Sequence, residues 1–293
     1  MGRLFNKRDF LRLIGSAAVA APTAVVAAKT TQKDNKSSGR ENAAYERIMR
    51  TNILRCGYAI WEPGLSLDPN TGKLTGIYYD FIDAIGQHTG LKMEWVGEIS
   101  WSDYPTALNS GRIDAMCFGA WPKANLAREV LFSDPTYYLP IYAYVREGDT
   151  RFDHAIDKVN DPAVIISTID AELSSELART RFPKAKTFSS PDMSPASTLL
   201  LNVASGKADI TFTDAWHGDA YRKANPGKLR VVSLEHPLRL FGHVIPVAKN
   251  EYSLLALLNA ATAEIIDSGE FEAIMRKYEQ TPGVLLMRKE DYQ

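Results

Sequence analysis

An internal repeat constrains the fold of this chain more than any other feature of its sequence. The segments SGRIDAMCFGAW (residues 110–121) and SGKADITFTDAW (residues 205–216) share a Ser-Gly pair, an aspartate and a closing Ala-Trp pair. An amphipathic helical run precedes each glycine, which ends helices readily because it takes the left-handed conformation without strain. The mostly apolar run after each aspartate predicts a buried parallel strand. One duplication at this long period predicts two similar α/β lobes, because a solenoid needs three or more short repeats.

The rest of the chain alternates between strand-like and helix-like segments. Strands are predicted over residues 53–59, 91–96, 163–167 and 229–233, and helices after Asp80 and over residues 171–181. This alternation is typical of a mostly parallel sheet flanked by helices, with one such sheet in each lobe. Ligands of such sheets bind outside the carboxyl ends of the strands, where both Ala-Trp loops are expected. We therefore predict an α/β chain of two lobes with a ligand cleft between them.

The composition excludes several classes of protein. The chain has 293 residues, enough for about two domains, and it is 45% hydrophobic and 24% charged, as globular proteins are. Its 34 Lys and Arg nearly balance 35 Asp and Glu, and no basic stripe interleaved with aromatic residues is present. A nucleic-acid partner is therefore not expected. Two cysteines cannot build a disulfide framework.

The first 28 residues predict an export signal. A basic stretch that includes Lys7 and Arg8 leads into a short apolar run, and small residues follow to Ala28. These are the parts of a secretory signal, so we expect cleavage near Ala28 and a periplasmic location. The segment looks like a twin-arginine signal in which Lys7 replaces the first arginine, so both that route and the general secretory route stay open. A membrane anchor is disfavoured because Pro22 interrupts the run and a spanning helix needs roughly 20 apolar residues. Residues 29–44 are polar and predict a flexible leader.

Short blocks follow one another along the chain in a specific order. They are LRCGY (54–58), GKLTG (72–76) with Asp80, SGRID (110–114), FSDP (132–135) with Tyr137 and Tyr138, SGKAD (205–209), and GEF (269–271) with Lys277 and Tyr278. In order and spacing these blocks resemble the family 3 (amino-acid-type) extracellular solute-binding proteins, over about residues 45–280. The resemblance implies the type II periplasmic-binding-protein fold. It also implies a monomeric, hinged receptor that delivers a small solute to the membrane permease of an ABC importer.

The resemblance places the lobes along the chain. It implies lobe 1 over residues 45–145, lobe 2 over residues 146–245, and a return to lobe 1 with the C-terminal helices over residues 246–293. The two crossings between the lobes are expected near residues 142–148 and 243–249.

Asp214 is the first candidate for ligand contact. It directly follows the predicted strand of the second repeat, at the position where the resemblance implies a carboxylate that holds a ligand ammonium. Gly119 occupies the matching place in the first repeat. A carboxylate in a cleft of low dielectric prefers a cationic partner. The alternative is that Asp214 caps the following helix, as aspartate commonly does.

The resemblance also implies an arginine that clamps the α-carboxylate of the ligand, and this chain departs from that pattern. The place falls on Leu126, and Lys123 and Arg128 stand near it in sequence. Helical spacing sends Arg128 in a different direction from Leu126. An ordinary α-amino acid is therefore disfavoured as the ligand unless Lys123 or Arg128 replaces the missing arginine.

Aromatic side chains take the place of the missing arginine in the predicted cleft. The residues predicted to line the cleft beside Asp214 are Trp61, Glu62, Phe118, Gly119, Trp121 and Trp216. Each tryptophan face attracts a cation by about 0.5 to 2 kcal/mol, and aromatic cages with a carboxylate hold ammonium groups. We therefore expect an amine or quaternary ammonium ligand with Asp214 as its ion partner. The alternative is that Phe118 and one tryptophan belong to the core of the lobe.

The remaining candidates rest on position or spacing alone. Thr168 and Asp170 lie in the first strand-to-helix loop of lobe 2, where the resemblance implies ligand contact at a helix N-terminus. The five histidines show no metal-ligand spacing, so neither a metal nor another cofactor is expected. Cys56 and Cys117 lie in predicted strands and are most simply buried apolar residues, although an oxidising compartment permits a disulfide.

Together with the resemblance, these patterns predict a periplasmic solute-binding protein, not an enzyme, for a small amine-containing or amino-acid-like solute. The resemblance implies that it closes by hinge motion and delivers the solute to an ABC permease. Two alternatives stay open. Enzymes similar to cyclohexadienyl dehydratase share this fold, and Asp214 and His217, three residues apart, could act as an acid and base pair. A ligand sensor without transport would need a membrane-embedded partner.

Overall fold

The computed structural model describes residues 41–279 and 285–286, which belong to one compact unit. The predicted export signal, residues 1–28, and the predicted leader up to residue 40 lie outside the described residues. The last two leader residues already belong to helix α1 (Ala43–Thr51). In the described part of the chain, no helix is both long and apolar enough to cross a membrane.

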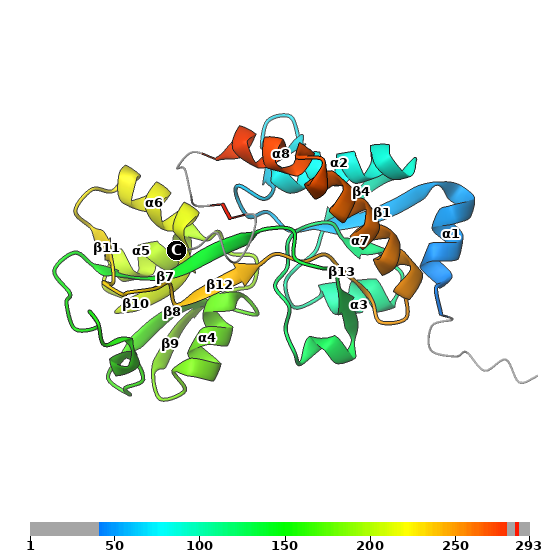
Figure 1. Cartoon of the computed structure of the whole chain (residues 1–293). Helices are drawn as coiled ribbons and strands as arrows, with labels where there is room; N and C mark the ends of the chain where they lie inside the picture. The colour runs from blue at the N-terminus through cyan, green and yellow to red at the C-terminus, as the bar shows by residue number, and fades with distance from the viewer. Residues whose placement is uncertain (1–40, 280–284, 287–293) are drawn as a thin grey trace, which may run out of the picture. The chain divides into compact units, whose positions relative to one another are not determined.

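The first lobe is built on a five-stranded mixed sheet (Figure 1). Its strands lie in the order β4 (Lys92–Glu98), β1 (Ile53–Tyr58), β5 (Ala115–Met116), β13 (Pro246–Ala248) and β6 (Val130–Phe132). Strands β4, β1 and β5 are parallel, whereas β13 is antiparallel to both of its neighbours. The helices of this lobe are α1, α2 (Ile77–Thr89), α3 (Tyr104–Asn109), α7 (Tyr252–Asp267) and α8 (Glu270–Tyr278). The C-terminal helices pack on this lobe, because the rings of Phe81 in α2 and Phe271 in α8 are both fully buried with centroids 4.7 Å apart.

The second lobe is built on a six-stranded sheet that contains β7 (Tyr138–Arg146), the longest of the described strands. The sheet order is β11 (Leu229–Val231), β7, β10 (Ile210–Asp214), β8 (Ile165–Ile169) and β9 (Lys186–Ser190), and β12 (Arg239–Gly242) also pairs with β7. Strands β10, β8 and β9 are parallel, whereas β7 is antiparallel to its partners. Its helices are α4 (Leu173–Arg181), α5 (Ser197–Ala204) and α6 (Ala215–Ala224). A small hairpin, β2 (Ser66–Leu67) with β3 (Leu74–Thr75), and the 3₁₀ turns η1 (Leu126–Arg128) and η2 (Ile156–Val159) complete the described elements.

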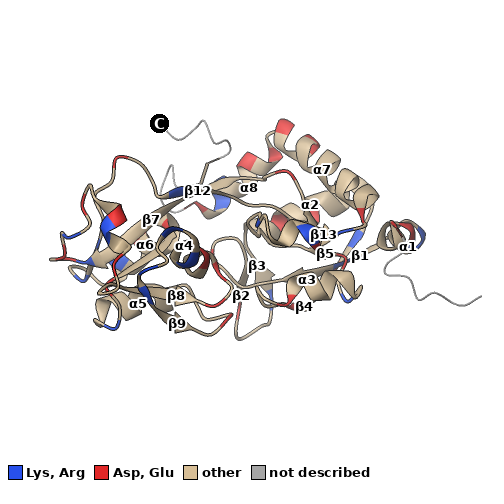
Figure 2. Cartoon of the chain, turned by 90° about the horizontal axis from the view of Figure 1, so that it is seen from below, with Lys and Arg blue, Asp and Glu red and all other residues tan. Residues whose placement is uncertain are grey.

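Burial follows the expected pattern of a core under each sheet. Figure 2 shows that Lys, Arg, Asp and Glu lie mostly on helices and connecting loops, whereas the central strands carry few charges. Strand β10 is buried at all five positions, as the apolar run of the second repeat predicts. The two-lobed α/β architecture is therefore confirmed, and each sheet is mixed because one strand, β13 or β7, runs opposite to the others.

The first crossing between the lobes lies earlier than the resemblance implied. Strand β7 pairs with β10 and β12 and so belongs to the second sheet, which puts the crossing between Phe132 and Tyr138 instead of near residues 142–148. Lobe 2 accordingly starts at Tyr138 and not at residue 146. The apolar run of β7 would suit either core, so its composition does not mark the boundary. The second crossing lies between Gly242 and Pro246.

The aspartates of the two repeats have the same role in the two lobes. The N–H of Asp114 donates to the carbonyl of Arg55 (2.9 Å), and its carboxylate accepts from the N–H of Arg55 (2.8 Å). Asp209 makes the matching pair with Ile165, at 2.7 and 2.9 Å. Each aspartate thereby ties the start of its own strand to the neighbouring parallel strand.

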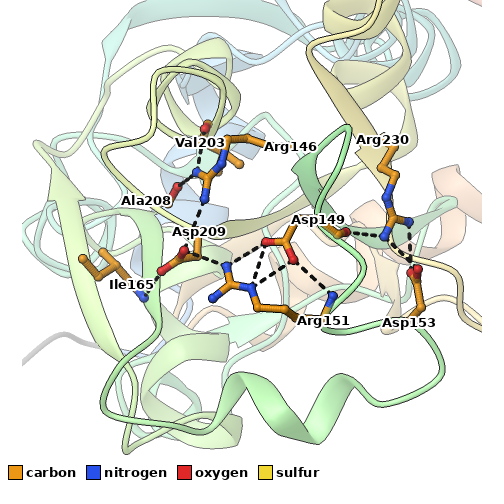
Figure 3. A network of polar contacts seen from close by, with 9 residues as sticks. All are labelled: Arg146, Asp149, Arg151, Asp153, Ile165, Val203, Ala208, Asp209 and Arg230. Carbon is orange, nitrogen blue, oxygen red and sulfur yellow. Dashed lines mark hydrogen bonds and ion pairs between the residues drawn. The ribbon is translucent and has the colours of Figure 1, made fainter.

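Each of these carboxylates also binds two arginines. Asp114 contacts Arg47 and Arg55, and Asp209 contacts Arg146 and Arg151. Figure 3 shows Asp209 between its two guanidinium groups, with further ion pairs beside it. The repeated Asp is therefore a structural residue in both lobes, away from the carboxyl ends of the strands.

Removing the first of these aspartates is expected to destabilise the protein more than removing the second. The Asp114 side chain is 0% exposed, whereas that of Asp209 is 19% exposed, so water can replace more of the lost contacts in lobe 2. We expect Asp114→Ala to lower the free energy of unfolding by about 3 kcal/mol and Asp209→Ala by roughly half of that. Urea denaturation of both variants measures the difference. The control is Asp157→Ala, because the Asp157 side chain is 95% exposed and its removal should hardly change the free energy of unfolding. Equal losses of unfolding free energy for Asp114→Ala and Asp209→Ala would contradict the role of burial.

The two cysteines are joined. Cys56 in β1 and Cys117, directly after β5, form a disulfide between two neighbouring parallel strands, and both residues are buried. The simplest prediction from sequence, two unlinked apolar residues, is thus replaced by the alternative that an oxidising compartment allows. Since Cys117 precedes Phe118 and Gly119, the bond anchors the segment that carries these two candidates.

Candidate functional site

A small cavity lies between the two lobes, at the carboxyl ends of β5, β8 and β10. Its free volume is small, about 30 Å³, so the cavity holds a few water molecules at most. The first lobe contributes Trp61, Trp101, Phe118, Gly119 and Trp121 to its wall. The second lobe and the crossing segments contribute Leu139, Ile141, Glu172, Leu173, Thr213, Asp214, Phe241 and His243. A solute the size of an amino acid therefore needs the lobes or the side chains of the wall to move apart.

Asp214 is both a helix cap and part of the cavity wall. It ends β10 and accepts the N–H of His217 (3.0 Å) at the start of α6, which confirms the capping alternative. Its carboxylate also accepts from Nδ1 of His217 (2.9 Å) and, across the lobes, from Nε1 of Trp61 (3.3 Å). Burial by itself would raise the pKa of Asp214, but the attraction of His217 and these hydrogen bonds outweigh it and lower the pKa. Asp214 is therefore a buried carboxylate that stays ionised.

Three of the predicted aromatic residues meet at this cavity. The Trp61 ring lies edge to face on the His217 ring (4.9 Å between centroids), and Phe118 packs tilted on Trp101 (5.7 Å). Trp121 is nearly buried and faces Phe241. Phe118 and Trp121 belong to the hydrophobic core and also line the cavity, so the two interpretations of these residues do not exclude each other.

Gly119 is required by the close approach of two rings. A Cβ at this position would lie 2.1 Å from Nδ1 of His243 and 2.5 Å from the hydroxyl oxygen of Tyr78. Neither neighbour has room to yield, because Tyr78 and His243 are both buried. The first repeat therefore has glycine where the second has Asp214, and the rings of Tyr78 and His243 pack against its backbone.

Neither of the two basic residues near Leu126 lies in the cavity. Nζ of Lys123 lies 4.1 Å from the centroid of the Trp121 ring and donates to the carbonyl of Ala171 in the second lobe (2.7 Å). Burial lowers the pKa of Lys123, against the attraction of nearby acids. Arg128 is exposed on η1. Among the described residues, no lysine or arginine lines the cavity.

Two polar residues of the wall were not predicted from the sequence. Glu172 caps α4 by accepting from the N–H (2.7 Å) and the hydroxyl (2.5 Å) of Ser174, and its burial raises its pKa. The loop turns at Ala171, whose φ of 61° is left-handed, so Glu172 rather than Asp170 reaches the cavity. His243 lies in the second crossing segment, which only the tertiary structure brings to the strand ends. The sequence signal for Glu172 was an acidic residue at the start of a predicted helix. No sequence signal marks His243.

Four of the predicted residues lie elsewhere. Thr168 is buried inside β8, and Asp170 accepts a hydrogen bond from Ser189 outside the cavity. Glu62 and Trp216 line a separate groove of about 640 Å³, which Trp61 and His217 also border. Thr168 and Asp170 therefore do not border the small cavity, whereas Glu62 and Trp216 border the groove beside it.

The chain matches known proteins over most of its length. The family model of the bacterial extracellular solute-binding proteins, family 3, covers residues 54–281. The chain is 25% identical over 223 residues to a probable histidine-binding protein of Neisseria gonorrhoeae, covering 75% of this chain and 80% of the relative. It is 25% identical over 218 residues to the arginine-binding extracellular protein ArtP of Bacillus subtilis (strain 168), covering 70% and 78%. The crystal structure of the ancestral amino acid-binding protein AncCDT-1, a precursor of cyclohexadienyl dehydratase, matches with a TM-score of 0.69 at 24% identity, covering 80% of this chain and 98% of that one.

Proposed function

Because this chain belongs to the family 3 bacterial extracellular solute-binding proteins and has their two-lobed type II fold, we propose that it captures a small amine-containing solute between its lobes. In this proposal the export signal takes the protein to the periplasm, where it acts as a monomer. The closed, loaded form then delivers the solute to the permease of an ABC importer.

The chemistry of the cavity wall carries the proposal. Asp214 and Glu172 place two carboxylates in a wall that is otherwise mostly aromatic and apolar, and no lysine or arginine of the described chain lines it. A buried carboxylate is stabilised by a cationic partner, and tryptophan faces attract cations as well. A ligand carboxylate would instead face Asp214 and Glu172 without a guanidinium to hold it. An amine without an α-carboxylate therefore fits this wall better than an ordinary amino acid does.

The two crossing segments provide a hinge for closure. They are hydrogen-bonded to each other, from the N–H of Thr136 to the carbonyl of His243 (2.8 Å) and from the N–H of His243 to the carbonyl of Tyr137 (2.9 Å). On the cleft side, Asp192 of the second lobe accepts from the backbone N–H of Ser102 (3.0 Å) in the first. Lys123 with Ala171 and Trp61 with Asp214 also join the two lobes. These contacts are on the cleft side of the paired crossings, and they support opening and closing of the lobes about those crossings.

A panel of solutes tests the proposal. Thermal unfolding of the chain without residues 1–28 is measured with the common L-amino acids, cadaverine, agmatine, choline and prephenate. A ligand at about 100 times its dissociation constant adds roughly 2.7 kcal/mol, so the melting temperature should rise by several degrees with amines. A rise with ordinary neutral amino acids and none with amines would overturn the proposal.

An enzyme of the same fold is the second candidate. The Asp214 carboxylate orients the His217 ring through Nδ1, and Nε2 of that ring has no partner among the described residues. This arrangement is that of a general base held by an acid. Turnover of prephenate in a coupled assay would favour the enzyme, and a thermal shift without turnover would favour the binding protein.

A further inference from the structure

The hydrogen bonds that His243 makes in the hinge come from its backbone and not from its ring. His243 lies between β12 and β13, in the second crossing segment. Its carbonyl accepts from both the N–H (2.8 Å) and the hydroxyl (3.2 Å) of Thr136, and its N–H donates to Tyr137. These bonds use main-chain atoms of residue 243, so any residue except proline could make them. The hinge therefore does not explain why the side chain is an imidazole.

The imidazole ring lies in an aromatic niche. It is 3% exposed, it stacks on Tyr137 (4.3 Å between centroids, 12° between planes), and it forms a T-shaped pair with the Phe241 ring (4.5 Å between centroids). Neither Nδ1 nor Nε2 has a hydrogen-bond partner within residues 41–279 and 285–286. Buried polar atoms are hydrogen-bonded in the great majority of native structures, and an exception calls for a physical reason. A phenylalanine would fill the same niche without leaving two polar atoms unpaired.

Burial keeps the His243 ring neutral despite the charged group nearest to it. Burial lowers the pKa of His243 to about 3, and the opposing effects of Asp214 on β10 and of the Gly119 backbone beside the ring are too weak to offset it. Burial also raises the pKa of Tyr78 on α2 and of Tyr137, so both hydroxyls stay protonated. Glu172 is the other acid that lines the cavity. A neutral imidazole has one nitrogen that donates a hydrogen bond and one that accepts.

We propose that His243 is a specificity-determining residue, whose unprotonated ring nitrogen accepts a hydrogen bond from an N–H of the bound ammonium group while Asp214 supplies the opposite charge. The inference rests on the proposed function and narrows it. An ammonium group taken from water into the cavity needs an acceptor for each N–H, because a buried polar hydrogen without a partner is costly. Asp214, Glu172 and His243 supply three acceptors, which suits the three N–H groups of a primary amine. The ligand class is therefore a primary amine, and a quaternary ammonium ion is disfavoured.

Two amines that differ only in their N–H groups separate this proposal from a simple charge effect. Isothermal titration is carried out with cadaverine or agmatine, whichever shifts the melting temperature more in the panel, and with the form of that amine trimethylated at its primary amine groups. We expect His243→Phe to weaken binding of the primary amine by about tenfold or more, as the loss of one hydrogen bond to a charged group does. Binding of the trimethylated form should stay within about twofold, since that ion has no N–H to donate. His243→Gln, which restores an acceptor, should recover part of the affinity.

The controls distinguish recognition from a structural role. Without a solute, His243→Phe should melt no lower than the original protein, because it removes two unpaired buried atoms; a large fall in melting temperature would instead indicate a structural histidine. If the phenylalanine variant does not fold, His243→Leu also lacks an acceptor and serves the same comparison. His236→Phe, on an exposed loop, is the matched control and should leave both affinities unchanged. Equal losses of affinity for both amines, or no loss of affinity, would overturn the role of His243 but not the proposed function. If the original protein binds no amine, the proposed function itself is overturned.

Discussion

Asp214→Asn is expected to weaken amine binding by at least about 100-fold while leaving the fold in place. Losing one member of a buried, hydrogen-bonded charge pair costs 2 to 5 kcal/mol or more, which corresponds to a factor of about 30 to several thousand in affinity. Asparagine caps helices about as well as aspartate, so the start of α6 should persist. Titration with the best amine of the panel measures the affinity, and thermal unfolding without a solute checks the fold.

A matched variant shows whether the effect belongs to the cavity. Asp170→Asn removes a carboxylate from the neighbouring strand-end loop, where Asp170 bonds to Ser189 outside the cavity, and should not change the affinity. Trp121→Ala should weaken binding by about tenfold, in line with the loss of one aromatic wall. Unchanged affinity in both Asp214→Asn and Trp121→Ala would place the ligand elsewhere. The groove bordered by Glu62 and Trp216 would then be the next site to test.

Removing the disulfide is expected to produce the largest loss of stability. The bond closes a loop across a sequence separation of 61 residues, for which the chain-entropy model gives about 4 kcal/mol. In a chain of this size that loss lowers the melting temperature by roughly 8 to 16 °C. The double variant Cys56→Ala with Cys117→Ala, purified beside the oxidised protein, measures the difference.

A reducing agent provides the internal control for this prediction. It should lower the melting temperature of the original protein toward that of the double variant, and it should not affect the double variant itself. If the original protein melts at the same temperature with and without a strong reductant, the bond contributes nothing and the two cysteines act only as buried apolar residues. A large effect would agree with the proposed export, because disulfides persist in oxidising compartments.

Much of the architecture could be predicted from the sequence because the relevant signals are local. Each repeat contains a glycine that ends a helix, an aspartate that ties two strands, and a buried strand that ends at the cleft. Asp214 was predicted at a strand end because it directly follows such a run, and the structure places it in the wall between the lobes. The first crossing was predicted too late, since the apolar pattern of β7 is compatible with either sheet.

The sequence by itself determined the two α/β lobes, their family and the end of the strand that carries Asp214, because helix, turn and strand patterns depend on neighbours along the chain. Only the tertiary structure decided that Glu172 and His243 share a cavity with Asp214, and that Glu62 and Trp216 do not. Those contacts join residues from different lobes and from a crossing segment, and no periodic pattern encodes how far two lobes close. The left-handed turn at Ala171 and the hydrogen-bonded crossings set these positions, and with them the acceptors that a ligand would meet.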